Sequence, residues 1–538
     1  MSTKRDILAL LDELATLTIL DEGDPQSFRV RAYENARRSI ESITGDIAAM
    51  TEKDLVTLPG IGKSTASKIH EFASTGTSSK LDTLRAKFPP EFVRLTKVPG
   101  IGPKTARRLR DELGIENLDG LEAALDQQLL RALPGFGPAK EEKIARSIDK
   151  LGLRGKDIRF PIAEALPVAV TLVETVSAFA DVADASICGS LRRFRATVAD
   201  VDLIVSSNDP DTVSKQVVDL PIVGNLLGHG PTKTSFETQA GLQIDVRVVK
   251  PQQLGAAMQY FTGSKAHNIA VRQLALDKGL TLNEYGLTDV ETGEIVASES
   301  EEEIYLALGL QWVPPPMREG SGEIELAATN TLPRLVQLSD IRGDLHDHTN
   351  RSGDGRSPLA EMVREAARRG LEYLAITDHG ENLTINGISR AELLEQRREI
   401  ASLQEDYPDL RILHGCELNI SLDGELDYDP EFLSSFDWCV ASVHDHFDLP
   451  VEQQTVRLIK AMREPAVKAI GHLSGRMIGR RPGIEFDTEA VLDAAVLTGT
   501  ALEINGALER LDATPDVIRG GVDRGAELVI STDARHPA

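Results

Sequence analysis

The sequence is poor in cysteine, in aromatic residues and in long apolar runs. Only three of its 538 residues are cysteines, and none of them forms a Cys-x-x-Cys pair. We therefore expect Cys188, Cys416 and Cys439 to be small core residues in a reducing compartment, rather than metal ligands. No apolar run approaches the ~20 residues of a membrane-spanning helix, and residues 1–17 are amphipathic, unlike a signal peptide. The sequence predicts a cytoplasmic protein with no membrane partner.

The chain also lacks positive charge, with a formal net charge of −25. Taken alone, this value argues against a nucleic-acid partner. The excess of acid is uneven, however: residues 1–160 are nearly balanced, whereas residues 161–330 and 331–538 are both strongly acidic. Most of that acidity is expected to be solvated surface, and part of it is expected to recruit metal ions. The first third can still bind nucleic acid, and the length indicates roughly three to five domains.

One pattern occurs three times in the first third of the chain. It reads LVTLPGIGKSTASKI at 55–69, LTKVPGIGPKTARRL at 95–109 and LRALPGFGPAKEEKI at 130–144. Each copy predicts a helix, a tight glycine turn and a second helix, whose first N–H groups are free to bind phosphate. A plain helical connector would give one such copy, and three favour phosphate binding. The residues expected to contact DNA are Gly60, Gly62, Lys63, Gly100, Gly102, Lys104, Gly135 and Gly137.

Two aspartates interrupt the apolar run VADVDLIV at residues 198–205. On a strand, Asp200 and Asp202 would project from the same face, and burying both carboxylates is costly unless a cation compensates them. Asp245 lies in a second apolar run, LQIDVRVV, and would complete a set of three. Oxygen ligands of this kind suit Mg²⁺ or Mn²⁺. The preceding Gly189-Ser190 and the paired arginines predict that a phosphate group lies beside the metal.

These motifs resemble the nucleotidyltransferase core of family X DNA polymerases. The resemblance rests on four features: Gly-Ser-x-Arg-Arg, Asp-x-Asp, a later Asp, and the segment QYFTGSKAHNIAVR at 259–272. Lys265 is similar to the bacterial and archaeal branch, and FRVRAYENA at 28–36 resembles the family's small N-terminal domain. The resemblance implies that Asp200, Asp202 and Asp245 bind the metal ions and are catalytic. It implies that Arg272 binds the template strand. The residues that it implies for nucleotide binding are Gly189, Ser190, Arg193, Tyr260, Phe261, Gly263 and Asn268.

Three further positions bear on that resemblance. The family usually has glycine where this sequence has Ala199, and often has glycine where it has Phe194. Lys68 aligns with the Schiff-base lysine that removes a 5′-deoxyribose phosphate in some relatives. Phosphate binding is the alternative role for Lys68, because a lysine beside other cations suits either task.

Histidines gather in the last part of the chain, beyond the Pro/Gly-rich segment WVPPPMREGSGE at 312–323. Many of them end short apolar runs that alternate with helical patterns, which predicts an α/β barrel with its site at the carboxyl ends of the strands. The constellation resembles the polymerase and histidinol phosphatase (PHP) domain. The resemblance implies Mn²⁺ or Zn²⁺ bound by His346, His348, Asp354, His379, Glu417, His444, His472 and Asp533.

The last motif of that domain departs from the family. The family has Asp-Ala-His, whereas this sequence has Asp533-Ala534-Arg535 and then His536. Arginine cannot ligate a cation, and no counterpart of the family's final helix follows. We therefore expect a truncated C-terminus and leave the activity of this site open.

The sequence thus predicts a multidomain α and α/β protein, similar to a bacterial or archaeal family X polymerase with a C-terminal PHP domain. The expected domains are a helical DNA-binding domain at 1–85, a second helix-hairpin-helix domain at 86–155, a palm at 156–250, a thumb at 251–316, a linker at 317–340 and a PHP domain at 341–538.

The function implied is gap filling in base-excision-type repair by a two-metal mechanism, with 3′–5′ exonuclease or end-processing activity. The expected partners are gapped or nicked DNA and deoxynucleoside triphosphates, and the protein is expected to be a nucleoid-associated monomer. The alternatives are a protein that is mainly a 3′–5′ exonuclease or abasic-site nuclease, and a DNA-end binding scaffold without catalysis.

Overall fold

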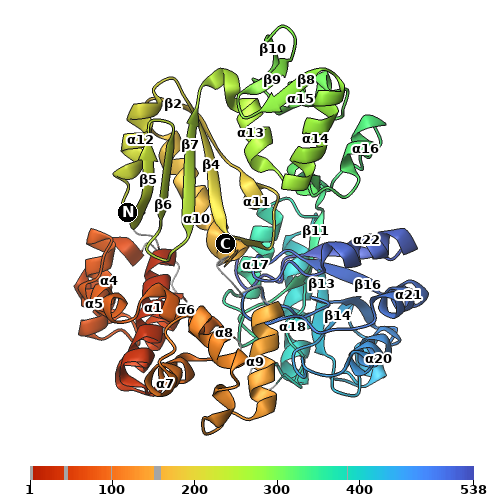
Figure 1. Ribbon diagram of the computed structural model, residues 1–538. Coiled ribbons are helices and arrows are strands. Elements are labelled where there is room, and N and C mark those ends of the chain that lie inside the picture. Colours follow the sequence, from red (N-terminus) through yellow and green to blue (C-terminus); the bar gives the residue numbers. More distant parts are fainter. Residues whose placement is uncertain (1–3, 42–46, 99, 151–158, 384–385, 538) are drawn as a thin grey trace. The chain divides into compact units, whose positions relative to one another are not determined.

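The computed structural model describes residues 4–41, 47–98, 100–150, 159–383 and 386–537 (Figure 1). The chain divides into two compact units. The first contains Met1–Arg159 together with Gly479–Arg481, and the second contains Phe160–Ile478 and Pro482–Ala538. Within the described ranges, no helix has both the length and the apolar character that a membrane crossing requires.

In the described residues of the first unit, all regular secondary structure is helical, as the sequence predicts. Its core forms around α1, whose leucines and isoleucines at helical spacing are fully buried, among them Ile7, Leu11, Leu14 and Leu17. The helices are α1 (Lys4–Glu22), α2 (Phe28–Glu41), α3 (Glu52–Thr57), α4 (Lys63–Thr75), α5 (Ser79–Lys87), α6 (Pro90–Arg94), α7 (Pro103–Leu113), α8 (Leu118–Asp126) and α9 (Pro138–Lys150).

The second unit begins with a five-stranded sheet in the order β2-β4-β7-β6-β5 (Figure 1). β4 and β7 are parallel neighbours, and the other pairs are antiparallel. Helices α10 (Ile162–Ser177) and α12 (Pro210–Val218) pack on this sheet. The strands are β2 (Val182–Ile187), β4 (Asp200–Ser207), β5 (Asn225–Gly230), β6 (Lys233–Glu237) and β7 (Gln243–Val249), with β1 (Phe160–Pro161) and β3 (Thr197–Val198) as a separate pair.

A smaller subdomain of helices and antiparallel strands follows in the chain. Its core contains Val271, Leu282, Leu287, Ile304 and Tyr305. It comprises α13 (Leu254–Thr262), α14 (Lys265–Asp277), β8 (Leu280–Asn283), β9 (Gly286–Asp289), β10 (Ile295–Ala297), α15 (Glu301–Ala307) and α16 (Glu323–Ala328).

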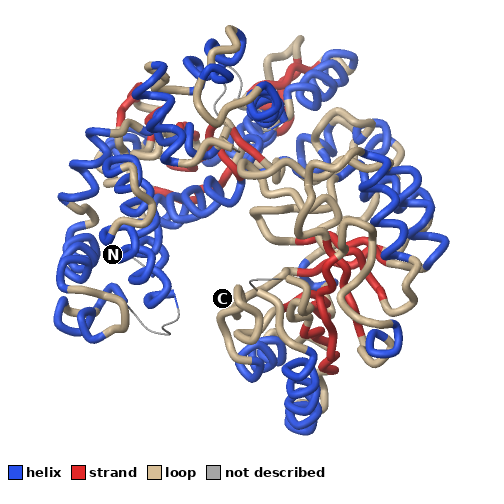
Figure 2. The backbone as a smooth tube through the Cα atoms, turned by 90° about the horizontal axis from the view of Figure 1, so that it is seen from below, coloured by secondary structure: helices blue, strands red, loops and turns tan. Residues whose placement is uncertain are grey.

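The remainder of the second unit is a parallel sheet of seven strands paired in chain order. Its two edges approach each other: Asp347 bridges to Ala534, and the His348 N–H donates to the Ala534 carbonyl at 2.8 Å. The sheet is therefore a nearly closed α/β barrel, which confirms the predicted architecture, and Figure 2 shows helices outside its strands. The strands are β11 (Gly343–Asp347), β12 (Tyr373–Ile376), β13 (Arg411–Asn419), β14 (Trp438–Ser442), β15 (Val467–Ile470), β16 (Ala501–Asn505) and β17 (Leu528–Ser531).

Helices occupy the connections between these strands, as expected where parallel neighbours are joined by crossovers. They are α17 (Leu359–Arg368), α18 (Arg390–Asp406), α19 (Pro430–Leu433), α20 (Val451–Met462), α21 (Thr488–Thr498) and α22 (Pro515–Arg524). The carboxyl ends of all seven strands meet at one rim, where a site can form.

Candidate functional site

The three glycine turns of the first unit share one geometry. The first glycine of each has a positive φ, namely +77° at Gly60, +90° at Gly100 and +80° at Gly135. The N–H of the apolar residue between the glycines donates to the carbonyl three residues earlier: Ile61 to Leu58, Ile101 to Val98 and Phe136 to Leu133. Glycine adopts the left-handed region without strain, which is why the pattern requires it there.

The second glycine of each turn directly precedes a helix of eleven or thirteen residues. Gly62 and Gly102 are the N-caps of α4 and α7, and glycine offers no side-chain acceptor to the first N–H groups of either helix. Gly137 stands in the same place before α9. The exposed Lys63 and Lys104 follow at once. These helix starts combine free N–H donors with positive charge, which suits a phosphate backbone.

Lys68 lies one turn further along α4. Its ammonium donates to the Ser64 carbonyl at 2.9 Å and to the Ser64 hydroxyl at 2.7 Å, and it lies 6.0 Å from the centre of the Tyr33 ring. Partial burial, together with the cations Lys80 and Arg29, lowers the pKa of Lys68. A lysine with a lowered pKa is a better nucleophile than an ordinary surface lysine.

The palm carboxylates come together on β4 and β7. Asp202 is paired in register with Asp245 across these two parallel strands, and Asp200 precedes Asp202 by two residues. Burial raises the pKa of Asp202 to about 7, and the neighbouring carboxylates of Asp200 and Asp245 add to this effect. The three acids therefore form a strongly anionic site of the kind that divalent cations stabilise.

A cation of the protein already touches this site. Lys233 on β6 places its ammonium 2.8 Å from Asp245. Although burial opposes the effect, hydrogen bonds from Lys233 and Ser235 lower the pKa of Asp245. Sequence reasoning missed Lys233, because nothing in the pattern of β6 distinguishes it from a surface lysine.

Gly189 begins the short helix α11 (Gly189–Arg192) directly above the carboxylates. Its φ is +64°, and a Cβ at this position would lie 2.4 Å from Oδ2 of Asp202. Glycine is therefore required here by both space and backbone conformation. The close approach brings the backbone that precedes Ser190 against the metal-binding face, as expected for a phosphate-binding turn.

The paired arginines connect the palm to the following subdomain. Arg192 makes two hydrogen bonds to Glu301, at 2.9 and 2.8 Å, and the fully buried Arg318 binds the same carboxylate at 2.6 Å. Arg193, predicted to bind the triphosphate, donates to Glu319 at 2.8 Å and to the Thr262 carbonyl. The guanidinium of Arg193 is thus paired with a carboxylate that sequence reasoning did not identify.

The predicted nucleotide-binding segment contacts Arg193 at Thr262 and Gly263. Gly263 has a φ of +67°, and a Cβ there would lie 3.2 Å from Nη1 of Arg193. The rings of Tyr260 and Phe261 meet edge to face with centroids 5.0 Å apart. Asn268 donates to the Tyr260 carbonyl at 2.7 Å, and Arg272 is exposed on α14. Tyr260, Phe261 and Asn268 lie close to the turn between α13 and α14, whereas Arg272 lies further along α14.

Phe194 has a φ of +59° and its side chain is 49% exposed. The left-handed region is strained for any residue with a Cβ. This strain is the physical reason why a glycine after the paired arginines would be favoured.

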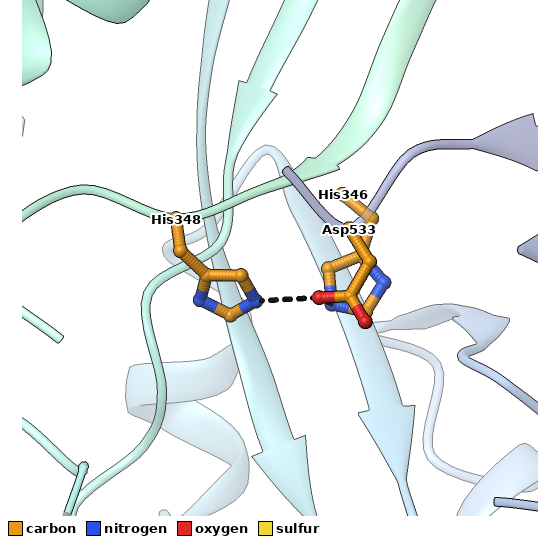
Figure 3. A group of neighbouring side chains, drawn as sticks. All are labelled: His346, His348 and Asp533. Carbon is orange, nitrogen blue, oxygen red and sulfur yellow. Dashed lines mark ion pairs between the residues drawn. The ribbon is translucent and has the colours of Figure 1, made fainter. Parts of the chain in front are cut away.

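The predicted ligands of the last domain converge at the carboxyl ends of the barrel strands. His346 and Glu417 lie within β11 and β13, and the others directly follow a strand or lie in the loop after it. Figure 3 shows His346, His348 and Asp533 side by side, with Nε2 of His348 3.3 Å from Oδ1 of Asp533. The three groups whose ligand atoms lie within 4.8 Å of one another are His346, His348 and Asp533; His348, Asp354 and His379; and His379, Glu417 and His444.

Glu417 is the centre of the cluster. Its Oε1 lies 3.1 Å from Nε2 of His444 and 3.0 Å from Nε2 of His472, and its Oε2 lies 2.9 Å from Nδ1 of His379. Although burial opposes it, the surrounding histidines hold the pKa of Glu417 well below its usual range. Burial also opposes the positive charge of His379, but Glu417 and Asp354 raise the pKa of His379 to about 10.

Several of these atoms are buried without a hydrogen bond of good geometry. They are Nε2 of His346, Nε2 of His348, Nδ1 of His379 and Oε2 of Glu417. Buried polar atoms normally have hydrogen-bond partners, so this set of nitrogens and oxygens facing one another fits a divalent cation held between them. The mixed imidazole and carboxylate donors fit Mn²⁺ or Zn²⁺. His472 and Asp533 also have positive φ angles of 26° and 55°, a strain that collects at functional sites.

Four family profiles match the chain. "Helix-hairpin-helix domain" matches residues 2–78, "SAM-like Helix-hairpin-helix tandem" 92–150, "DNA polymerase beta thumb" 257–319 and "PHP domain" 344–513. The chain is 38% identical to "DNA polymerase/3'-5' exonuclease PolX" of Bacillus subtilis (strain 168) over 538 residues, which cover 99% of this chain and 92% of that protein. This chain belongs to the PolX family of DNA polymerases.

Two other relatives match parts of the PolX-family chain. "DNA polymerase lambda" of Rattus norvegicus is 25% identical over 333 residues, which are 55% of this chain and 53% of that protein. A "Probable phosphatase" of Acetivibrio thermocellus is 34% identical over 165 residues, which are 30% of this chain and 64% of that protein. The predicted family, its helix-hairpin-helix regions, thumb and PHP domain are thus confirmed.

The PHP site of this PolX-family chain contains residues that sequence reasoning missed. Glu503, on β16, binds Nδ1 of His346 at 2.7 Å through Oε1 and accepts the His472 N–H through Oε2. The sequence feature that could have identified Glu503 is an acidic residue inside the apolar run ALEIN at 501–505. Arg510 lies 3.3 Å from Oδ2 of Asp533 and had no distinguishing signal.

His414, a further histidine of the last part of the chain, is buried in the core. Its ring stacks on Phe436 at 4.9 Å, and burial together with the nearby Arg397 lowers its pKa to about 4. It is therefore neutral at pH 7 and serves packing rather than metal binding.

Proposed function

We propose that this PolX-family chain is a DNA-directed DNA polymerase that fills short gaps during base-excision-type repair, and that its PHP domain trims 3′ ends. The observation that carries the polymerase activity is the register of Asp202 opposite Asp245 with Asp200 beside them, directly under Gly189. Such a set of carboxylates beside a glycine turn suits nucleotidyl transfer.

In the palm, Mg²⁺ or Mn²⁺ would activate the attacking hydroxyl and stabilise charge on the leaving pyrophosphate. Asp200, Asp202 and Asp245 supply the ligands. Gly189 and Ser190 present backbone and hydroxyl donors to the triphosphate, and Arg193 adds charge after it leaves Glu319. Tyr260, Phe261 and Gly263 surround the sugar of a deoxynucleoside triphosphate, and Asn268 contacts the nucleotide.

The helix-hairpin-helix turns bind the backbone of gapped or nicked DNA, and Arg272 contacts the template strand. The support for this role is the three-fold repetition of one turn geometry with helix N–H donors and exposed lysines. Binding of this kind falls steeply with salt and reads no sequence. We propose that the protein acts as a monomer, in the cytoplasm and on the nucleoid.

In the PHP domain, Mn²⁺ or Zn²⁺ would supply a hydroxide for phosphodiester hydrolysis. His346, His348, Asp354, His379, Glu417, His444, His472 and Asp533 hold the ions. Glu503 orients His346, since a hydrogen bond to the second ring nitrogen fixes the tautomer and the ring plane. A cavity of about 680 Å³ opens beside Asp533, and Arg356, Arg510 and Arg535 line it with positive charge suited to a DNA phosphate.

Lys68 is a second candidate for catalysis. Its lowered pKa and its place one turn after the first glycine turn favour a Schiff-base role in removing a 5′-deoxyribose phosphate. Borohydride trapping on a 5′-deoxyribose-phosphate substrate tests it: the Lys68→Arg variant should form no adduct, and the variant of the exposed Lys53, Lys53→Arg, should form as much as the parent. An adduct that survives in Lys68→Arg would leave phosphate binding as the role of Lys68.

Single-nucleotide incorporation into a one-nucleotide gap, with Mg²⁺ or Mn²⁺, tests the polymerase. The parent should extend the primer and Asp202→Asn should not, whereas Asp184→Asn, a substitution of an exposed acid on β2, should extend it normally. A parent that degrades but never extends the primer would make the protein a nuclease. A parent that binds gapped DNA without changing it would make it a scaffold.

A further inference from the structure

The three ligand groups of the PHP site overlap. The group of His348, Asp354 and His379 shares His348 with the group that contains Asp533, and shares His379 with the group that contains Glu417. A neutral imidazole offers a metal ion the lone pair of one ring nitrogen, while its other nitrogen carries a proton. When the two outer groups bind ions through these histidines, the middle group keeps only Asp354 as a ligand of its own.

The side chain of Arg535 lies on that remaining ligand. Its Nε is 2.9 Å from Oδ2 of Asp354, and its Nη1 is 2.7 Å from Oδ1 of Asp533. The guanidinium thus bridges a carboxylate of the middle group to a carboxylate of an outer group. It keeps its positive charge at any relevant pH and has no lone pair to offer a metal ion.

Backbone contacts hold Arg535 in this position. Its Nη1 also donates to the Asp533 carbonyl at 2.7 Å, and its own carbonyl accepts the N–H of Arg356 at 2.8 Å. Only 27% of its side chain is exposed. A partly buried arginine that bridges two carboxylates and has fixed backbone partners is a built-in cation of the site, rather than a surface side chain that a metal ion would displace easily.

We propose that Arg535 substitutes for a metal ion in the middle group, so that the PHP centre of this chain takes two divalent ions instead of three. The two ions occupy the outer groups, one with His346, His348 and Asp533 and one with His379, Glu417 and His444. Arg535 balances the charge of Asp354 and closes the middle group. This inference rests on the metal-dependent phosphoesterase proposed above.

Metal counting on the full chain tests the proposal without any activity assay. The parent for this test carries Asp200→Asn and Asp202→Asn, which remove two of the three proposed palm ligands and leave only Asp245. The protein is stripped with chelator, loaded with excess Mn²⁺, desalted and measured by mass spectrometry. We expect about two Mn²⁺ per chain in the parent and about three in Arg535→His, because a histidine supplies the donor that the middle group lacks.

Two matched variants test whether the additional ion requires a histidine, and whether it requires that histidine at position 535. Arg535→Lys keeps the positive charge and should hold about two ions, as should Arg364→His, which introduces a histidine at an exposed position of α17. If Arg535→His does not fold, Arg535→Ala with added imidazole provides the missing donor instead. It should hold its third Mn²⁺ only when imidazole is present.

Three ions in the parent would overturn the proposal and leave the metal centre intact. So would two ions in a folded Arg535→His protein, or three in Arg364→His. Retention of fewer than one ion by every variant would overturn the proposed metal centre itself. Anomalous scattering from Mn²⁺ in crystals of Arg535→His should place the additional ion between His348, Asp354 and His379.

Discussion

Asp202 and Asp245 stand directly opposite each other on the parallel strands β4 and β7. This relationship explains how an apolar strand tolerates two acidic residues. Asp200 and Asp202 belong to a set of three with Asp245, and Lys233 already neutralises one member of the set at 2.8 Å. Burial raises the pKa of Asp202 to about 7, and the neighbouring carboxylates of Asp200 and Asp245 add to this effect. The site is therefore prepared for cations.

Replacing Gly189 with alanine should impair incorporation of nucleotides. The new Cβ would lie 2.4 Å from Oδ2 of Asp202 and would have to displace that carboxylate or the turn. We expect kcat/KM for gap filling to fall by ~100-fold, because displacements of about 1 Å at a reacting centre have effects of this size. Gly293→Ala is the matched control: its φ is +72° and its Cβ would meet open space. Equal losses in both variants would show that backbone strain, rather than contact with Asp202, is responsible.

Replacing Glu319 with glutamine should tighten nucleotide binding. Glu319 pairs with Arg193 at 2.8 Å, and the triphosphate must compete with it for the guanidinium. We expect KM for the nucleotide to fall by roughly two- to fivefold, the size expected of a partly exposed ion pair. Steady-state kinetics on gapped DNA measure this, with the exposed Glu325→Gln as control. A higher KM would mean that Glu319 positions Arg193 for the nucleotide instead of competing with it.

Replacing Glu503 with glutamine should weaken metal binding in the PHP domain. The carboxylate accepts hydrogen bonds from His346 and from the His472 backbone, and an amide can accept only one of them. We expect the affinity for Mn²⁺ to fall by roughly 10- to 100-fold, measured by competition with a chelating dye. Gap filling should be unchanged, and Glu527→Gln on the surface should bind Mn²⁺ normally. An unchanged affinity would exclude the orienting role of Glu503.

Replacing Phe194 with glycine should stabilise the protein slightly. Phe194 has a φ of +59°, and relief of this strain outweighs the greater freedom of glycine in the unfolded chain. We expect a gain of up to about 1 kcal/mol, seen as a higher midpoint in thermal denaturation. Phe194→Ala removes the exposed ring but keeps the strain, so it should give no gain. Stabilisation of both variants to the same extent would trace the effect to the ring.

Much of this arrangement could be predicted from the sequence, because motifs with local physical requirements determine it. The three glycine turns need positive φ angles, and Asp200 and Asp202 share a face because strand side chains alternate. The histidines at strand ends predicted a barrel site, since parallel strands bring their carboxyl ends together.

The remaining features depend on contacts between segments far apart in the chain. Lys233 meets Asp245 only because β6 pairs with β7, and Glu319 reaches Arg193 across 126 residues. Arg535 was predicted to be no ligand, but its bridge between Asp354 and Asp533 depends on how the last loop folds back to the barrel rim. No local pattern specifies such pairs.

Separating the two proposed activities tests whether the chain carries two independent active sites. Gap filling and 3′ trimming are measured in parallel for the parent, Asp202→Asn and Glu417→Gln on the same gapped DNA. We predict that Asp202→Asn loses gap filling and keeps trimming, and that Glu417→Gln keeps gap filling and loses trimming. Loss of both activities in either variant, or trimming that persists in Glu417→Gln, would contradict the account.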